Sequence, residues 1–114
     1  MHPTITREEL AQAIADGGVT VVEALPPMHF ADAHLPGAVN LPHDRVRELA
    51  PALLPDRNAR IVVYCANTPC QNSGIATREL IAMGYSDVRE YAEGKQDWVE
   101  AGLPVEAGAH AAAA

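Results

Sequence analysis

The sequence predicts a single α/β domain whose mostly parallel central sheet carries helices on both faces, and three observations support this prediction. A chain of 114 residues is long enough for one compact core and too short for two. Runs of β-branched residues alternate with segments of helical spacing, an order typical of parallel sheets. The segment "RIVVYC", residues 60–65, is apolar after its first residue, so it is expected at the centre of the sheet.

The first helix and the first strand have clear boundary signals. Thr6 and Glu9 have the spacing of a capping box, which predicts a helix over 7–15, and the glycine pair 17–18 supplies its end. The β-branched run that follows predicts a buried strand over 19–24. We therefore expect a helix to lead into the first strand of the sheet.

Prolines shape the next segment. Four of them between residues 26 and 42 leave room for one helical turn and a short extended piece, and not for a long helix. Asp44 is then predicted to cap an amphipathic helix over 45–54. Pro51 should kink or interrupt that helix, because it lacks a backbone donor.

The second half of the chain repeats the alternation. After the central strand, apolar residues recur at helical spacing from about residue 73 until Gly84, which predicts another helix. The segment 86–98 then predicts a short strand and a glycine-bearing loop, and a last helix is expected around 96–101.

Composition limits the partners and the compartment. With 15 acidic and 8 basic residues, the net charge of −7 repels nucleic acids and anionic membranes, so we expect neither as a partner. No apolar run is long enough to cross a membrane and no signal peptide is readable, which predicts a cytoplasmic protein. The domain is expected to span residues 1–106, and the Ala-rich tail 107–114 is expected to be disordered.

Cys65 ends the predicted central strand and is followed closely by a helix. The segment between them must turn sharply, so its backbone N–H groups should converge and form a cradle for an anion. A thiol beside such a cradle is expected to have a depressed pKa and to act as a nucleophile. Alternatively, Cys65 is a small buried residue at a strand end. The predicted cradle consists of Ala66, Asn67, Thr68, Pro69, Gln71, Asn72 and Ser73.

Cys70 is the second of the two cysteines. If Thr68 caps the helix, Cys70 lies in its first turn and is activated by the helix dipole. If the helix begins at 72–73, Cys70 lies in the loop; in both cases the two sulfurs are expected to be near each other. Zinc needs four ligands, and no second cysteine pair or histidine pair is present, so we expect no metal and no cofactor.

Three segments resemble single-domain rhodanese-like sulfurtransferases. They are "HLPGAVNLP" (34–42), "IVVYC" (61–65) and "YAEGKQDWVEAGLPVE" (91–106). The resemblance implies the rhodanese-like fold and an activity in which Cys65 is the catalytic residue. Cys65 would take a sulfane sulfur from a donor, hold it as a persulfide, and pass it to a thiol or another thiophilic acceptor.

The sequence also departs from the pattern of that family. Its members commonly carry Asp-x-Arg at the end of the first strand, where this chain has Glu23 and Leu25, and the usual cysteine loop contains Arg or Lys, whereas this one has neither. Arg78 is the only cation that the sequence places near the loop. We therefore expect weak thiosulfate turnover, because the dianion would bind to backbone amides alone, and a small-molecule or protein persulfide is the better donor.

The same loop bears on two other functions, one of which it argues against. Phosphatases and arsenate reductases of a related fold need an arginine six residues after the cysteine, and this chain has Gln71 there, which argues against phosphoryl transfer. A non-catalytic rhodanese-like module that binds a partner or senses redox state through the Cys65/Cys70 pair is the alternative function. Cys70 itself is either a resolving thiol that attacks a persulfide on Cys65, leaving a disulfide, or a packing residue.

Overall fold

The computed structural model describes residues 2–108. Its four strands form one parallel sheet in the order β2-β1-β3-β4. The strands are β1 (Thr20–Glu23), β2 (Val39–Asn40), β3 (Arg60–Tyr64) and β4 (Asp87–Tyr91). The helices are α1 (Arg7–Asp16), α2 (Pro27–Asp32), the 3-10 turn η1 (His43–Arg45), α3 (Val46–Leu53), α4 (Asn72–Ala82) and α5 (Gly94–Glu100).

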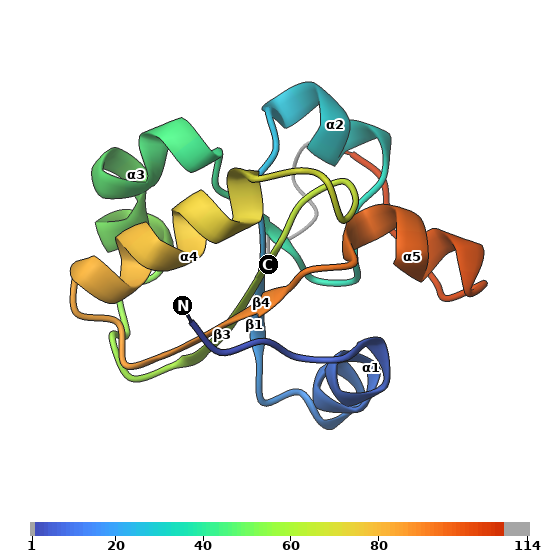
Figure 1. The fold of residues 1–114 in the computed structure, drawn as a ribbon, viewed down its shortest axis with the longest axis horizontal. Helices are drawn as coiled ribbons and strands as arrows, with labels where there is room; N and C mark the ends of the chain where they lie inside the picture. Colours follow the sequence, from blue (N-terminus) through green and yellow to red (C-terminus); the bar gives the residue numbers. More distant parts are fainter. Residues whose placement is uncertain (1, 109–114) are drawn as a thin grey trace.

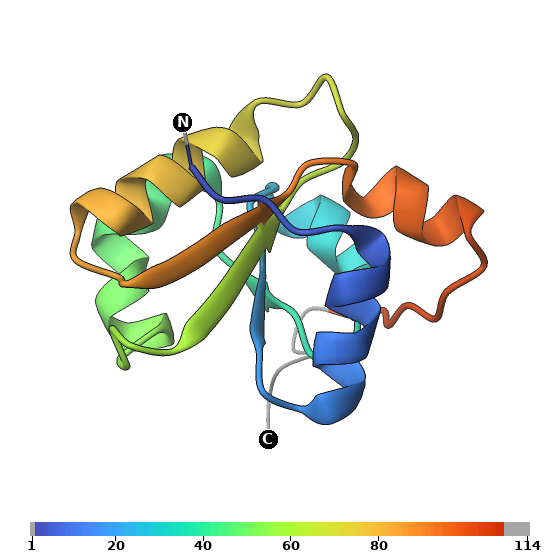
Figure 2. The ribbon, with the colours of Figure 1, turned by 60° about the horizontal axis from the view of Figure 1, so that its bottom comes forward.

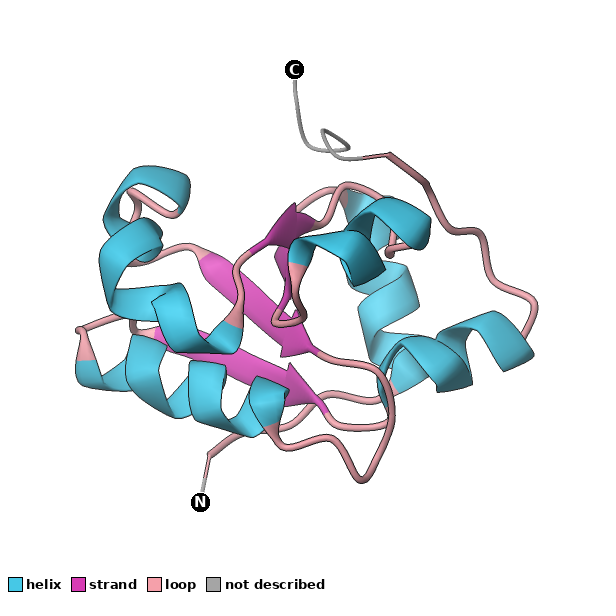
Figure 3. Cartoon of the chain, turned by 90° about the horizontal axis from the view of Figure 1, so that it is seen from above, coloured by secondary structure: helices cyan, strands magenta, loops and turns pink. Residues whose placement is uncertain are grey.

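The α/β fold class and the central position of β3 are confirmed. β3 pairs with β1 on one side and with β4 on the other, and all three run in the same direction (Figure 3). The carboxyl ends of these strands therefore meet at one edge of the sheet, where parallel sheets bind their ligands. Within residues 2–108, no helix is both long and apolar enough to cross a membrane.

The two faces of the sheet carry separate hydrophobic cores. Ile61 and Val63 of β3 pack toward α3 and α4, whereas Val62 and Tyr64 pack toward α1, α2 and α5 (Figure 1). Side chains of a strand alternate between its two sides, so one buried apolar run serves both cores. β3 is thus held from both faces, which fixes the position of the residue that follows it.

The predicted capping box of α1 is confirmed. The Thr6 hydroxyl accepts from the Glu9 N–H, and the Glu9 carboxylate accepts from the Thr6 N–H. Gly17 ends the helix in the left-handed conformation, with φ 79°. The segment before α1 lies beside the outer edge of β4, because Thr4 bridges to Glu90 (Figure 2).

One predicted helix start is wrong, and for another the structure decides between the two alternatives. Asp44 lies inside η1, and the N-cap of α3 is Arg45, which makes no side-chain cap, because the chain leaves Pro42 in a 3-10 turn before α3 begins. Of the two starts considered for α4, the later one is confirmed: its N-cap is Gln71 rather than Thr68, the helix begins at Asn72, and Cys70 lies in the loop. The helix is delayed because the Cys70 N–H closes a turn onto the Asn67 carbonyl, at 3.1 Å.

Two further expectations concern a proline and the tail. α3 is not interrupted at Pro51 but continues to Leu53, so the proline lies within its last turn. Most of the tail predicted at 107–114 lies outside the described residues. Gly108, the last described residue, donates its N–H to the Ala31 carbonyl at 2.8 Å.

Candidate active site

Cys65 directly follows β3 and is buried, with 1% of its surface exposed. The loop after it leads into α4, whose N-terminus faces the sulfur. The Cys65 Sγ lies 3.3 Å from the Oγ of Ser73, the second residue of α4. Of the predicted cradle residues, Ser73 is therefore the one whose side chain contacts the sulfur.

The start of α5 holds the beginning of the loop in place. The Lys95 N–H donates to the Cys65 carbonyl and the Gln96 N–H to the Ala66 carbonyl, both at 2.8 Å. Gly94 makes this approach possible, since it has φ 78° and a Cβ there would stand 2.7 Å from the Cys65 oxygen. No residue with a side chain fits at Gly94 without displacing the loop.

The Cys65 thiol does not have the depressed pKa that the sequence predicted. Burial raises its pKa, and the neighbouring Cys70 thiol raises it further. The hydroxyl and the backbone N–H of Ser73 act in the opposite direction, since both can donate to a sulfur anion, but they do not outweigh burial. The helix N-terminus is present as expected, and desolvation is the stronger effect.

Cys70 lies in the loop and is partly buried. Both cysteines are free thiols. The influence of Cys70 on the pKa of Cys65 agrees with the expectation that the two sulfurs are near each other.

Behind Ser73, a hydrogen-bonded chain continues to the N-terminal segment. The Ser73 hydroxyl donates to Glu90 Oε2 on β4 at 2.5 Å. The other carboxylate oxygen, Oε1, lies 2.6 Å from His2 Nε2. Ser73 is buried, and the His2 and Glu90 side chains are 11% and 14% exposed. Cys65, Ser73, Glu90 and His2 thus form one hydrogen-bonded chain that links the end of β3, α4, β4 and the N-terminal segment.

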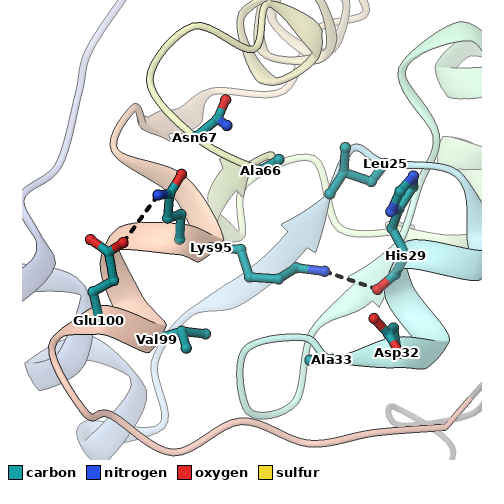
Figure 4. A pocket seen from close by; sticks show the side chains of 10 residues that line it. Leu25, His29, Asp32, Ala33, Ala66, Asn67, Lys95, Val99 and Glu100 are labelled. Atoms are coloured by element: carbon teal, nitrogen blue, oxygen red, sulfur yellow. Dashed lines mark hydrogen bonds between the residues drawn. The ribbon is translucent and has the colours of Figure 1, made fainter.

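A cavity of about 410 Å³ lies beside the loop on its other side (Figure 4). The Lys95 side chain extends along it and donates to the His29 carbonyl and to the buried carboxylate of Glu23, each at 2.9 Å. Glu23 Oε1 also accepts from the Tyr64 hydroxyl at 2.6 Å. The lining residues are Leu25, His29, Asp32, Ala33, Ala66, Asn67, Lys95, Gln96, Val99 and Glu100.

The expectation that Arg78 is the only cation near the loop is therefore wrong. Lys95 of α5 is closer to the loop, and it supplies the positive partner that Glu23 lacks within its own strand. Its charge is opposed by a fully buried carboxylate at 2.9 Å. The cation is thus already paired.

A second hollow of about 250 Å³ adjoins the loop and is acidic. Glu93, Asp97 and Glu100 contribute its three carboxylates, and it contains no basic side chain among the described residues. It also includes Asn67, Thr68, Pro69 and Gln96. Asp97 is paired with Arg7 at 2.9 Å, but Glu93 and Glu100 have no cationic partner among the described residues, so the surroundings of the loop disfavour a second negative charge.

The structure distributes the predicted site residues unevenly. Ala66 and Asn67 line the larger cavity, while Thr68 and Pro69 line only the acidic hollow. Gln71 is the N-cap residue of α4, although its side chain makes no capping hydrogen bond. Asn72 is the first residue of the helix.

Sequence reasoning missed His2, Glu90 and Lys95. Glu90 could have been noticed as a charged residue within a predicted strand, one position before Tyr91, which is buried. His2 and Lys95 carry no local signal, because their partners are distant in sequence.

Comparison with known proteins agrees with this geometry. The family model described as "Rhodanese-like domain" matches residues 6–101. An HTH-type transcriptional regulator of Mycobacterium tuberculosis is 35% identical over 92% of this chain, which spans 45% of that protein. The thiosulfate sulfurtransferase PspE of Escherichia coli is 37% identical over 62% of this chain and 65% of its own length. The chain thus spans about half to two thirds of these two relatives.

The fold has close counterparts among solved structures. A protein from Bacillus halodurans superposes with a TM-score of 0.85 at 23% identity, covering 98% of this chain and 82% of its own. At that identity the likeness concerns the fold. The family model matches residues 6–101, which is most of the chain, and the chain therefore belongs to the rhodanese-like domain family.

Proposed function

We propose that this protein is a sulfurtransferase that carries sulfane sulfur as a persulfide on Cys65. One observation carries the proposal: the thiol stands at the carboxyl end of the central strand and faces the hydroxyl and N–H of Ser73 at the start of α4. Donors in this position stabilise a sulfur anion, which is the charge that a thiolate or a bound persulfide carries.

The reaction takes place in two transfers. Cys65 attacks the outer sulfur of a donor R–S–SH, forming Cys65–S–SH while the donor S–S bond breaks and R–SH is released. An acceptor thiol then removes the outer sulfur and restores the Cys65 thiol. Sulfur moves from one thiol to another, and no external oxidant or reductant is required.

The charges around the loop favour a persulfide donor over thiosulfate. Lys95 is paired with Glu23, and the adjoining hollow carries the carboxylates of Glu93, Asp97 and Glu100. A missing charge-assisted hydrogen bond costs about 1.5–3 kcal/mol, or roughly ten- to a hundredfold in affinity. A less charged low-molecular-weight or protein persulfide avoids most of this cost.

Sulfur loading tests the assignment of the nucleophile. Wild type, Cys65→Ser and Cys70→Ser are incubated with glutathione persulfide, and the bound sulfur is measured by intact-protein mass spectrometry and by discharge with cyanide or dithiothreitol. Wild type and Cys70→Ser should gain one sulfur atom that the acceptor removes, and Cys65→Ser should gain none. If Cys65→Ser loads as well as wild type, the nucleophile is another residue.

Redox sensing through the two thiols is the second candidate function. It is favoured by the effect of Cys70 on the Cys65 thiol and by the relative that is named a transcriptional regulator. Cys70 would attack Cys65–S–SH, release hydrogen sulfide and leave a Cys65–Cys70 disulfide. Persulfide-loaded wild type should then show a loss of two hydrogens relative to the reduced protein. Sulfide release without that loss would argue that Cys70 only packs beneath the loop.

A further inference from the structure

The hydrogen bonds that link Cys65 to His2 have a fixed donor-to-acceptor direction at the buried end, where Cys65 lies. The Cys65 thiol donates to Ser73 Oγ, and the Ser73 hydroxyl donates to Glu90 Oε2. The 2.5 Å separation of the two oxygens is typical of a hydroxyl bonded to an ionised carboxylate. Because a hydroxyl carries one proton, Ser73 cannot donate to both neighbours at once. With Cys65 as a thiol, both side-chain donors therefore point toward Glu90; once the thiol proton has passed to Ser73, the hydroxyl donates to the sulfur anion instead.

Burial leaves the Cys65 proton few other routes. Cys65 and Ser73 are each 1% exposed, so solvent has little access to the sulfur. Burial also raises the pKa of the thiol, which keeps the reactive thiolate scarce at neutral pH. A thiol in this position needs a nearby group to take its proton when it attacks a donor.

The other polar side chains near this hydrogen-bonded chain lie at its carboxylate end. His2 contacts Glu90 from the N-terminal segment, and Arg78 approaches it from α4. A Cβ on Gly74 would stand 3.3 Å from an Arg78 guanidinium nitrogen and 3.7 Å from Glu90 Oε2. Cys70 is the titratable group that faces Cys65 itself.

We propose that Glu90 accepts the Cys65 proton through the Ser73 hydroxyl, so that the buried thiol becomes nucleophilic without first losing its proton to water. This inference rests on the proposed function, because it supplies the proton acceptor for sulfur transfer. Glu90 acts here through Ser73 and does not contact the sulfur.

The proton balance covers both transfers. As Cys65 attacks the donor R–S–SH, its proton passes to Ser73 Oγ, the Ser73 proton passes to Glu90 Oε2, and the released R–S⁻ takes a proton from water. When an acceptor thiolate later removes the outer sulfur, Cys65 leaves as a thiolate. It regains its proton from Glu90 by the reverse route.

The pH dependence of Cys65 alkylation tests this role without any sulfur donor. Iodoacetamide modification is followed by peptide mass spectrometry, which separates Cys65 from Cys70. Wild type should react at a rate that changes little between about pH 6 and 8, because the proton stays within the chain. Glu90→Gln and Ser73→Ala should instead gain about tenfold per pH unit and react at least about tenfold more slowly near pH 6.

The test distinguishes a proton acceptor from a simple electrostatic effect, because the two predict opposite changes in the alkylation rate of Glu90→Gln. If Glu90 merely repels the thiolate, Glu90→Gln should react faster than wild type near pH 6, and this result would overturn the proposal. An unchanged pH profile would do the same. The double variant should be no slower than either single variant, because both changes break one route.

Two controls complete the experiment. Glu79→Gln removes a carboxylate from the surface of α4, where it pairs with Arg47, and should leave the profile unchanged. Ser73→Ala removes a single buried atom and carries the test if Glu90→Gln weakens the fold. If wild type keeps the predicted profile but takes up no persulfide, the sulfurtransferase assignment fails while the proton acceptor stands.

Discussion

The ammonium group of Lys95 lies 2.9 Å from the fully buried carboxylate of Glu23 and links the start of α5 to the end of β1. The second oxygen of that carboxylate, Oε2, is buried without a hydrogen-bond partner among the described residues. Lys95 therefore supplies the charge that makes this burial tolerable.

Replacing Lys95 should destabilise the fold. Lys95→Met leaves the Glu23 charge buried without its cation, so the free energy of unfolding should fall by about 3 kcal/mol, measured by urea denaturation. The double variant Glu23→Gln/Lys95→Met removes both charges and should recover part of the loss. Equal losses in the single and double variants would show that the ion pair is not the cause.

Gly94 and Gly102 form a matched pair for testing the contact between α5 and the loop. Both have φ 78°, but a Cβ on Gly94 would stand 2.7 Å from the Cys65 oxygen, whereas one on Gly102 would meet nothing within 4 Å. Gly102→Ala should cost about 1–2 kcal/mol in unfolding free energy for its backbone conformation alone. Gly94→Ala should cost more and should also abolish persulfide loading. Equal costs would contradict the steric role of Gly94.

A cation placed in the loop should improve the use of thiosulfate. Asn67 lines both hollows, so Asn67→Lys should raise thiosulfate:cyanide turnover by about tenfold, and high salt should reduce the gain. Gln12→Lys adds the same charge on α1, away from the loop, and should change turnover little. A similar increase in both variants would point to net charge rather than to the loop.

The contribution of Asp97 to the free energy of unfolding should decrease as the pH falls into the acid range. The Tyr91 hydroxyl, at 2.6 Å, and the Arg7 guanidinium hold the pKa of Asp97 below its ordinary value. A carboxyl with a lower pKa in the folded state stabilises above its unfolded pKa and loses that contribution as the pH falls through the folded value. The stability deficit of Asp97→Asn relative to wild type should therefore shrink between neutral pH and about pH 3, measured by urea midpoints. A deficit that stays constant with pH would exclude this linkage.

The elements that sequence reasoning predicted correctly are those specified by neighbouring residues. The Thr6–Glu9 capping box and the apolar run of β3 each lie within a few positions of the chain. The pKa of Cys65 was predicted in the wrong direction because the position of a helix N-terminus is visible in a local pattern, whereas the depth of burial depends on the whole fold.

The missed residues depend on contacts between distant parts of the chain. His2 and Glu90 are separated by 88 positions, and a charged residue in a short strand reads locally as a solvated one. Lys95 likewise looks like an ordinary surface lysine until α5 is placed against β1. Periodicity and capping signals carry no information about such pairs.

The contact between α5 and the loop also determines which way the loop's peptide groups are turned. In a planar trans peptide the carbonyl and the following N–H point in opposite directions. Since the carbonyls of Cys65 and Ala66 are bound by the N–H groups of Lys95 and Gln96, the amides of Ala66 and Asn67 are directed away from α5. The orientation of the peptide groups in this stretch is thus imposed by two N–H groups of a helix thirty positions downstream, and not by the loop residues themselves.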